Sequence, residues 1–294
     1  METKGTAAAF IGTGVMGASM AGHLLDAGVK LSVYNRTKSK AEPLAKRGAL
    51  LADSVSQALE QAKIVFTMVG YPRDAEELYF GPDGIRENTA PGQIHVDHTT
   101  SDPALAVRIA EEAARRNLHA LDAPVSGGDI GARNATLTIM AGGLETKYNE
   151  ILPFLEKMGN KIVLQGKAGA GQHTKMANQI AIAGTLAGSV EAIRYAEAAG
   201  LDPLRVLESI GGGSAQSWQL VNMVPRMLKG DFEPGFYAKH FLKDLRIALD
   251  NARAMKLELP MLEMAERFFA SAQEKGFGEK GTQILYCLYR DGLL

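Results

Sequence analysis

A glycine-rich loop near the N-terminus has the spacing of a dinucleotide-binding loop. Gly12-Thr13-Gly14-Val15-Met16-Gly17 follows a short apolar run and opens a helical pattern. In such loops the first glycine permits the turn, the second lets the backbone approach a pyrophosphate, and the third lets helix and strand pack closely. The helix N-terminus then offers free N–H groups to the phosphates. The bare pattern also occurs in turns without a ligand, but a place between strand and helix is what the motif requires. The predicted cofactor contacts of the loop are Gly12, Gly14, Val15, Met16 and Gly17, and two further predicted contacts, Met68 and Val69, stand at the end of the apolar run 64–69.

The end of the second apolar run bears on the choice of dinucleotide. NAD enzymes usually place an acid there, about 20 residues beyond the loop, to bind the ribose 2′-hydroxyl. This chain has Asn35-Arg36-Thr37, with Lys38 and Lys40 nearby, and we expect no carboxylate to be in place to repel a 2′-phosphate. Arg36 can form a bidentate, charge-assisted pair with that phosphate. The sequence therefore favours NADP, with NAD as the second choice; the alternative is that Arg36 only stacks on adenine and discriminates poorly.

A second turn, at Asp122-Ala-Pro-Val-Ser126-Gly127-Gly128, has groups that could bind a carboxylate. It exposes several backbone N–H groups together with a hydroxyl, which is a suitable cradle for an anion. By itself such a segment is more often an ordinary loop.

Lys175 is the candidate proton donor. It stands in Gly169-Ala-Gly171-Gln-His-Thr-Lys175-Met-Ala-Asn178, at the start of a long helical pattern. Asn178 is three residues further on and shares its helix face. An ammonium group there could protonate a developing alkoxide while the amide holds the oxygen. Taken alone, a lone lysine is usually a solvated one.

The elements that must position these residues follow from the pattern of apolar runs. Runs alternate with helical segments through the first half, which is typical of βαβ units and a mostly parallel sheet covered on both faces. Strands are expected at 7–11, 31–34, 64–69, 94–97, 120–125, 136–141 and 161–165, and helices at 16–27, 38–47 and 103 to about 117. Asp102 before Pro103 has the form of an N-cap followed by proline at the first helical position.

The character of the chain changes at the glycine-rich joint of residues 166–171. Residues 172–199 contain no proline and only two glycines, and a helix of that length would span on the order of 40 Å. Gly200 is placed as its C-cap. Helices are then expected at 203–210, 217–229, 240–255, 262–275 and 282–290. The predicted organisation is a Rossmann domain over 1–166, an interdomain helix over 167–199 and an all-helical domain over 200–294.

Composition narrows the classes of partner. The 294 residues carry a formal net charge of −1, with 46% hydrophobic and 22% charged residues, as in an ordinary soluble globular protein. These values give no electrostatic reason to expect nucleic acid or an anionic membrane as partner. The N-terminal apolar run is too short for a signal sequence, and no apolar stretch reaches membrane-spanning length. The single cysteine, Cys287, is expected to pack in a C-terminal helix, and the composition suits the cytoplasm.

Five ordered motifs together resemble those of the β-hydroxyacid dehydrogenase family. That family includes 3-hydroxyisobutyrate dehydrogenase, tartronate semialdehyde reductase and glyoxylate/succinic semialdehyde reductases. The motifs are the glycine loop, Asp97-His98-Thr99-Thr100, the segment 122–128, the segment 169–178 and Lys243-Asp244-Leu245. The resemblance covers essentially the whole chain, and Asn35-Arg36-Thr37 is most similar to the NADP-using semialdehyde reductases.

The resemblance implies a role for each motif. Lys175 would be the catalytic acid/base with Asn178 as its partner, and Ser126, Gly127 and Gly128 would bind the substrate carboxylate. Thr100 would contact the cofactor near the nicotinamide ribose. From the C-terminal domain, Lys243 would reach the cofactor, and Phe236 and Asp244 the substrate. Without the family match, Phe236 is more simply a core residue, and Lys243 and Asp244 a solvated helix face. The family also implies a homo-dimer or homo-tetramer.

Some positions depart from the family or stay open. Ala135 stands where the family often has a glycine before Thr-Leu, and Gln179 replaces the second asparagine of Lys-x-x-Asn-Asn. Because some semialdehyde reductases share that glutamine, we expect intact chemistry. Arg133 could add charge for a second carboxylate, although a surface position is the simpler interpretation. His98, His173 and His240 lie near motifs, but no pair has convincing metal-ligand spacing, so no metal site is expected.

The sequence therefore predicts an NADP-dependent enzyme that interconverts a small carboxylated aldehyde, of the glyoxylate or succinic semialdehyde type, and its hydroxy acid. A 3-hydroxyisobutyrate or tartronate semialdehyde type of substrate is the alternative. An imine reductase or a non-catalytic NADP-binding protein is disfavoured because such relatives typically lack this lysine. The C-terminal half is also much shorter than that of 6-phosphogluconate dehydrogenase.

Overall fold

A computed structural model of the chain describes residues 1–293. Two compact units emerge, one over residues 1–175 and one from residue 176 onward. The first unit is built on a nine-stranded sheet. Its strands are β1 (Ala7–Ile11), β2 (Lys30–Tyr34), β3 (Leu50–Leu51), β4 (Ile64–Thr67), β5 (Ile94–Asp97), β6 (His119–Asp122), β7 (Val125–Ser126), β8 (Leu137–Gly142) and β9 (Gly159–Gly166).

The strand order is β3-β2-β1-β4-β5-β6-β8-β7, with β9 beside β8. Strands β1 to β6 pair in parallel, β8 runs antiparallel to β6 and β7, and β9 is parallel to β8. The first six strands have the order of a dinucleotide-binding Rossmann sheet. The predicted mostly parallel sheet is confirmed.

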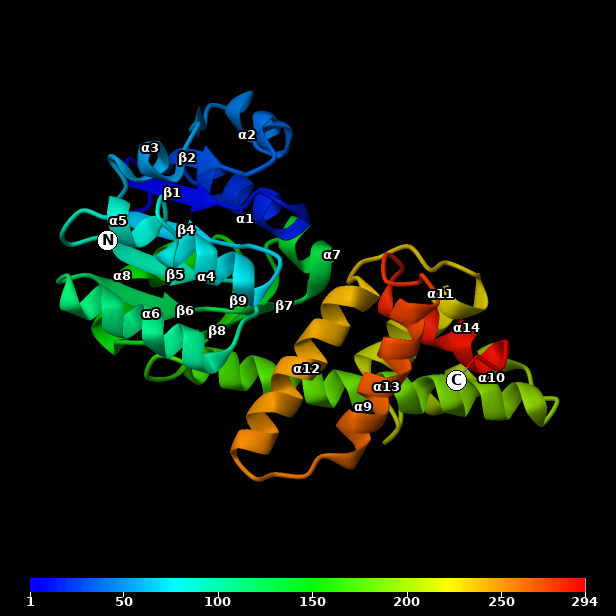
Figure 1. The fold of residues 1–294 in the computed structure, drawn as a ribbon. Helices are drawn as coiled ribbons and strands as arrows, with labels where there is room; N and C mark the ends of the chain where they lie inside the picture. Colours follow the sequence, from blue (N-terminus) through cyan, green and yellow to red (C-terminus); the bar gives the residue numbers. More distant parts are fainter. Residues whose placement is uncertain (294) are drawn as a thin grey trace. The chain divides into compact units, whose positions relative to one another are not determined.

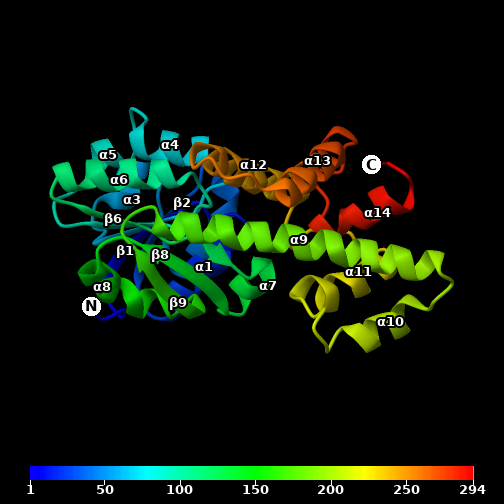
Figure 2. The same cartoon turned by 90° about the horizontal axis from the view of Figure 1, so that it is seen from below.

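Helices cover both faces of this sheet. They are α1 (Val15–Asp26), α2 (Glu42–Ala45), α3 (Val55–Leu59), α4 (Pro72–Phe80), α5 (Ile85–Asn88), α6 (Pro103–Arg115), α7 (Gly128–Arg133) and α8 (Glu145–Leu155). Figure 2 shows α4, α5 and α6 on one side of the sheet and α1 and α8 on the other. Successive residues of a strand point to opposite faces. Phe10 of β1 accordingly packs in one core with α1 and α8, and its neighbour Ala9 packs in the other with α3 to α6.

Two sequence-based predictions within the first unit were wrong in detail. The helix expected at 38–47 is a 3-10 turn at Lys38–Lys40 followed by the short α2. Pro43 near the start of α2 lacks an N–H and restricts the residue before it, which prevents a continuous helix. The strand expected at 120–125 is broken into β6 and β7 at Ala123-Pro124, because proline cannot donate to a sheet ladder. Strand β3 and helices α3, α4, α5, α7 and α8 are not among the elements predicted from the sequence.

The second unit is helical, with one isolated bridge between Tyr237 and Gly281. Helix α9 (Ala170–Ala198, Figure 1) contributes residues to both units. Gly200, with φ of +76°, follows its last turn, and the N–H of Leu201 donates to the carbonyl of Ala196 at 2.9 Å, as in a Schellman cap. The other elements are α10 (Pro203–Ile210), a π-helical turn (Gln219–Met223), α11 (Val224–Leu228), α12 (Ala238–Ala254), α13 (Pro260–Glu274), a 3-10 turn (Thr282–Ile284) and α14 (Leu285–Arg290). Cys287 is buried in α14, as expected.

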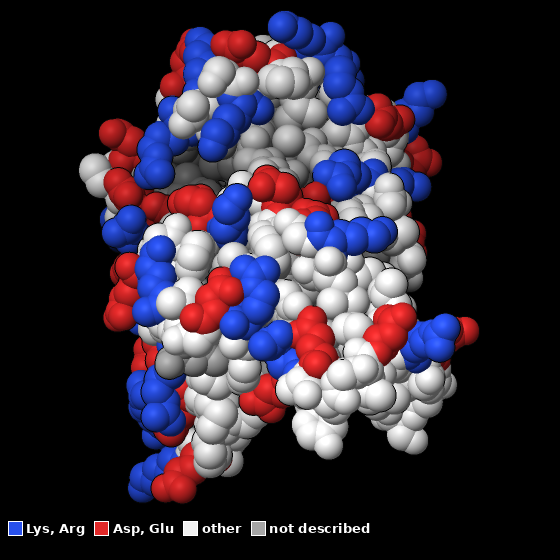
Figure 3. Space-filling view, turned by 90° about the vertical axis from the view of Figure 1, so that its right-hand side faces the viewer, with Lys and Arg blue, Asp and Glu red and all other residues white. Residues whose placement is uncertain are grey.

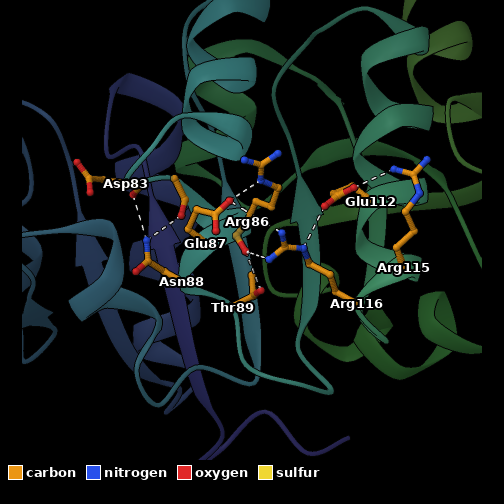
Figure 4. Close-up of polar contacts among 9 residues, drawn as sticks. Asp83, Arg86, Glu87, Asn88, Thr89, Glu112, Arg115 and Arg116 are labelled. Atoms are coloured by element: carbon orange, nitrogen blue, oxygen red, sulfur yellow. Dashed lines mark hydrogen bonds and ion pairs between the residues drawn. The ribbon is translucent and has the colours of Figure 1, made fainter.

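An ionic network ties α5 to α6 at the surface of the first unit (Figure 4). Glu112 accepts from Arg115 at 2.9 Å and from Arg116 at 3.0 Å, and Arg116 also donates to the carbonyl of Arg86 at 2.7 Å. The two arginines hold the pKa of the Glu112 carboxyl below its usual range. Since α5 and the end of α6 precede β5 and β6, the network lies at the amino ends of the strands. Ligands of such sheets bind at the opposite edge, so we assign the network to structure.

The surface charges and the helix lengths bear on other classes of partner. On the face drawn in Figure 3, basic and acidic side chains lie next to one another in the upper part and along the left margin, and broad areas lower down are uncharged. Within residues 1–293, no helix is both long and apolar enough to cross a membrane.

Ala135 adopts a left-handed backbone conformation, with φ of +54°, between α7 and β8. This conformation costs an L-residue about 1–2 kcal/mol relative to glycine, partly offset by the greater freedom of glycine in the unfolded chain. We therefore expect Ala135→Gly to raise the free energy of unfolding by about 0.5–1 kcal/mol in urea denaturation. The matched control is Asn117→Gly. Asn117 has a φ of 57°, and asparagine tolerates this conformation, so this substitution should relieve less strain. An unchanged or lower stability of Ala135→Gly would contradict the assigned strain.

Candidate functional site

The loops that carry the sequence motifs follow neighbouring strands of the first unit. Three backbone N–H groups donate to backbone carbonyls of the neighbouring strand. They are those of Met68 to Ile11 at 2.9 Å, of His98 to Thr67 at 2.8 Å and of Ala123 to Asp97 at 2.7 Å. These bonds align the carboxyl ends of β1, β4, β5 and β6. The glycine loop, Met68-Val69, Thr99-Thr100 and the Ser-Gly-Gly turn thus emerge at the edge where open α/β sheets bind ligands.

The three glycines of the first loop have three different surroundings. A Cβ on Gly12, whose φ is +96°, would lie 2.1 Å from the carbonyl oxygen of Met68, and one on Gly17 would lie 1.9 Å from that of Gly12. A Cβ on Gly14 would meet no heavy atom within 4 Å. Gly14 is also the N-cap of α1 and supplies no side chain to its N–H groups. The first and third glycines therefore close the turn, and the second leaves an open approach that fits a dinucleotide pyrophosphate.

Asn35 joins the first loop to the end of β2. Its Oδ1 accepts from the N–H of Thr13 at 3.0 Å and its Nδ2 donates to the carbonyl of Thr37 at 2.9 Å. The side chain thus shapes the loop, which sequence alone did not indicate.

Acids stand beside the basic residues that follow β2. Arg36 is largely exposed, and its Nη1 lies 3.7 Å from Oδ1 of Asp74 at the start of α4. Lys38 forms an ion pair with Asp53. The absence of a carboxylate holds for the segment 35–40 but not for its surroundings, because the fold brings in acids from 15 and more residues away. Arg36 must exchange a surface pair, which is worth at most about 1 kcal/mol, for any phosphate.

A buried carboxylate supports the Thr99-Thr100 loop. Asp97 Oδ1 accepts from Thr67 Oγ1 at 2.7 Å and from the N–H of Thr99 at 3.0 Å, and Thr99 Oγ1 accepts from the N–H of Val69 at 3.0 Å. Burial raises the pKa of Asp97 to about 6, against the opposing effect of these hydrogen bonds. Asp97 therefore fixes the two loops predicted to face the cofactor.

The titration of Asp97, His95 and His98 predicts how stability depends on pH. Burial lowers the pKa of each histidine from 6.5 to about 4, so protons bind the unfolded chain first and stability falls as pH drops from 6.5 towards 4. The pKa of Asp97 is raised, so the folded chain binds this proton first and stability rises as the pH drops from about 6 to 4. When the pH drops from 7 to 5, each histidine should lower the free energy of unfolding by about 2 kcal/mol, and Asp97 should raise it by about 1 kcal/mol.

Urea denaturation at pH 7 and pH 5 measures these contributions. The decrease in the free energy of unfolding between pH 7 and pH 5 should be about 2 kcal/mol smaller in His95→Leu and about 1 kcal/mol larger in Asp97→Asn than in the parent chain. Changes of equal sign in the two variants would show that other groups control acid sensitivity.

The Ser-Gly-Gly turn lies between β7 and α7. Ser126 ends β7, Gly127 with φ of 131° is the N-cap of α7, and Gly128 has φ of 63°. Helix α7 is held against α1 by a 2.9 Å hydrogen bond between His23 Nε2 and the carbonyl of Ala132. Arg133 is exposed and donates to Asp129 at 2.8 Å, which favours the surface interpretation.

Lys175 is 6% exposed and lies in the second turn of α9. Two other buried side chains hold the start of this helix. Asp122 Oδ1 accepts from the N–H of Gly169 and Oδ2 from that of Gln172, both at 2.8 Å. Burial raises the pKa of Asp122, while these backbone N–H groups act in the opposite direction. Gln172 is the second of these side chains, and it bonds to the backbone of Thr99 and Ser101. The sequence pattern did not identify it, because a glutamine in the middle of a motif has no spacing signal of its own.

In the second unit, four polar residues form a chain of contacts. Asn178 Nδ2 donates to Gln179 Oε1 at 2.7 Å, Gln179 Nε2 donates to Asp244 Oδ2 at 2.5 Å, and Lys243 Nζ lies 3.1 Å from Asp244 Oδ1. Asp244 and Gln179 are both buried, so Asp244 is not the solvated residue of the simpler interpretation. Gln179, the departure from the family pattern, is the residue that reaches Asp244.

Phe236 is partly buried, with its ring 5.8 Å from that of Phe241. Among residues 1–293 no group of three or more His, Cys, Asp or Glu side chains is arranged to hold a metal ion.

Comparison with known proteins agrees with this architecture. Residues 7–166 match the family model of the NAD-binding domain of 6-phosphogluconate dehydrogenase, and residues 169–289 match that of the NAD-binding domain of NADP-dependent 3-hydroxyisobutyrate dehydrogenase. An uncharacterized oxidoreductase of Bacillus subtilis is 51% identical over 95% of this chain and 97% of its own length. The 2-hydroxy-3-oxopropionate reductase of Escherichia coli is 38% identical over 94% of this chain and 92% of its own.

A solved structure leads to the same assignment. The 3-hydroxyisobutyrate dehydrogenase of Mycobacterium tuberculosis, determined with L-serine, has a TM-score of 0.89 at 29% identity, covering 97% of this chain and 99% of that one. The chain therefore belongs to the β-hydroxyacid dehydrogenase family, the 3-hydroxyisobutyrate dehydrogenase-like NAD(P)-dependent oxidoreductases that act on CH–OH groups.

Proposed function

We propose that the protein is an NADP-dependent reductase that interconverts a small carboxylated aldehyde and its hydroxy acid, with Lys175 as general acid/base. The observation that carries the proposal is the burial of Lys175 on a helix whose start is bonded to Asp122 at the end of β6 and to the carbonyl of Thr99 in the loop that follows β5. A lysine at this position can donate a proton to a carbonyl oxygen bound beside these loops.

The proposed reaction divides the work among few groups. The hydroxyl of Ser126 and the backbone N–H groups of Ser126, Gly127 and Gly128 hold the substrate carboxylate. When bound, the dinucleotide supplies or accepts a hydride. Lys175 gives its proton to the carbonyl oxygen as the C–O double bond is reduced, and Asn178 orients that oxygen. In the reverse direction the neutral amine takes the proton from the hydroxyl group.

Cofactor contacts and preference are part of the proposal. Gly12, Gly14, Val15, Met16, Gly17, Met68, Val69 and Thr100 are proposed to line the dinucleotide, and Asn35, Arg36 and Thr37 to meet its 2′-phosphate. Arg36 can form a bidentate pair with that phosphate, although its present neighbour Asp74 makes the preference for NADP moderate in size. The roles of Lys243 at the cofactor and of Phe236 and Asp244 at the substrate stay predictions.

One kinetic screen tests the proposed function. NADPH oxidation is followed with glyoxylate, succinic semialdehyde, tartronate semialdehyde and methylmalonate semialdehyde in parallel, and repeated with NADH at subsaturating cofactor. We expect turnover with at least one aldehyde and a higher kcat/KM for NADPH, reduced in Arg36→Ala. The names of the relatives point to tartronate semialdehyde or methylmalonate semialdehyde. The resemblance of Asn35-Arg36-Thr37 to the NADP-using semialdehyde reductases points to glyoxylate or succinic semialdehyde. No turnover with any of the four, or a preference for NADH, would refute the corresponding part.

Domain organisation and assembly complete the proposal. We propose a division into a domain over 1–166, a connecting helix over 167–199, and a domain over 200–294. A homo-dimer or homo-tetramer is supported by apolar side chains that the second unit leaves exposed: Leu201, Leu204, Trp218 and Val221. Light scattering of the purified chain, which would give a monomer mass if this is wrong, tests the assembly.

A further inference from the structure

The N-terminus of α9 receives its cap from a strand 47 residues earlier in the chain. Helix starts leave backbone N–H groups without an intrahelical acceptor, and the usual remedy is a local Ser, Thr, Asp or Asn. Residues 166–171 contain none of these. Instead Asp122, 4% exposed at the end of β6, accepts from Gly169 and Gln172 with its two carboxylate oxygens, both at 2.8 Å. The helix is thereby tied to one strand end.

Gln172 ties the same helix to a second strand end. Its side chain is fully buried. Oε1 accepts from the N–H of Ser101 at 3.0 Å, and Nε2 donates to the carbonyl of Thr99 at 2.7 Å. Both ends of the amide are therefore used, on either side of Thr100. Residue 172 precedes Lys175 by three positions, so the two share one turn of helix.

We propose that Asp122 and Gln172, which we call the α9 clamp, are positioning residues that set the place of Lys175 relative to the Thr99-Thr100 loop. This inference rests on the proposed role of Lys175. The clamp uses two buried polar side chains to make four hydrogen bonds to backbone groups. The lysine side chain has four rotatable bonds, so the position of its amine depends on the position of its Cα. A misplacement of about 1 Å at a reacting group can cost about 100-fold in rate.

Asp122→Asn is the primary test. The amide keeps the size of the carboxylate but has a single acceptor atom, so one of the two N–H groups loses its partner. We expect kcat to fall about 10- to 100-fold with the best aldehyde of the four, while the KM for NADPH changes less than threefold. In the Lys175→Ala background the same substitution should have almost no effect on single-turnover rates, because the clamp acts through Lys175.

Hydrogen exchange provides a readout that needs no substrate. Amides of residues 169–176 should exchange faster in Asp122→Asn than in the parent chain. Gln172→Met, which keeps the side-chain length but loses both hydrogen bonds, should reproduce the kcat loss if Asp122→Asn fails to fold. Asp202→Asn is the matched control: Asp202 caps α10 by accepting from the N–H of Leu204 at 2.9 Å, and its substitution should leave kcat unchanged.

The outcomes separate this inference from the proposed function. Retention of kcat within twofold in both clamp variants, or an equal loss with and without Lys175, would overturn the clamp as a positioning device. If Lys175→Ala itself retains turnover, the proposed function fails, and faster exchange of 169–176 would then leave Asp122 as a structural cap only.

Discussion

Lys175→Ala should lower kcat by about 10²–10⁴-fold, the usual contribution of a positioned general acid/base. Hydride transfer to a carbonyl builds negative charge on oxygen, and without the ammonium group that charge must wait for a proton from water. The KM of the aldehyde should change little, because its carboxylate is held by Ser126, Gly127 and Gly128. The measurement is steady-state NADPH oxidation with the aldehyde that the wild-type enzyme reduces fastest.

Two controls show whether the loss belongs to chemistry. The dissociation constant of NADPH, followed by fluorescence, should stay within about twofold of wild type, because no proposed dinucleotide contact is removed. Lys167→Ala removes an exposed lysine from the same joint and should leave kcat unchanged. Turnover of Lys175→Ala near the wild-type rate would refute its assignment as acid/base.

Alanine substitutions in the glycine loop should separate folding from cofactor binding. Gly17→Ala places a methyl group 1.9 Å from the backbone oxygen of Gly12, where only a shift of the loop can relieve the clash. We expect a loss of about 1–3 kcal/mol of stability together with weakened NADPH binding. Gly14→Ala meets no atom within 4 Å, and its φ of −71° suits an L-residue. That variant should keep wild-type stability.

Gly14→Ala should nevertheless bind NADPH at least tenfold more weakly. Its methyl group would occupy the open approach that we assign to the pyrophosphate. Thermal melting with and without NADPH measures both properties in one experiment, because a bound ligand raises the melting temperature. Wild-type affinity in Gly14→Ala would place the dinucleotide elsewhere, and normal stability of Gly17→Ala would contradict the close packing of α1 on the loop.

The glycine loop and the alternation of strands and helices could be predicted because their causes are local. Glycine spacing, apolar runs of strand length and Pro103 after Asp102 act over a few residues. The strand predicted at 120–125 is interrupted at Pro124, which has no N–H for the ladder, and the helix predicted at 38–47 is interrupted at Pro43 for a related reason. Helices α4 and α8 were missed because short amphipathic helices between strands carry a weak periodic signal.

Sequence determined which groups are available: Lys175 for proton transfer, the Ser-Gly-Gly turn for an anion, and Arg36 for a phosphate. Tertiary structure alone decided which neighbours those groups have. Asp74 reaches Arg36 from 38 residues away, Asp244 reaches Gln179 from 65, and Asp122 reaches Gly169 from 47. No periodicity or spacing rule links such pairs, because the sheet order and the packing of helices on strand ends bring them together. The contacts of Asp122 and Asp244 are made by buried and therefore strongly interacting groups, and they fix where the available chemistry is placed.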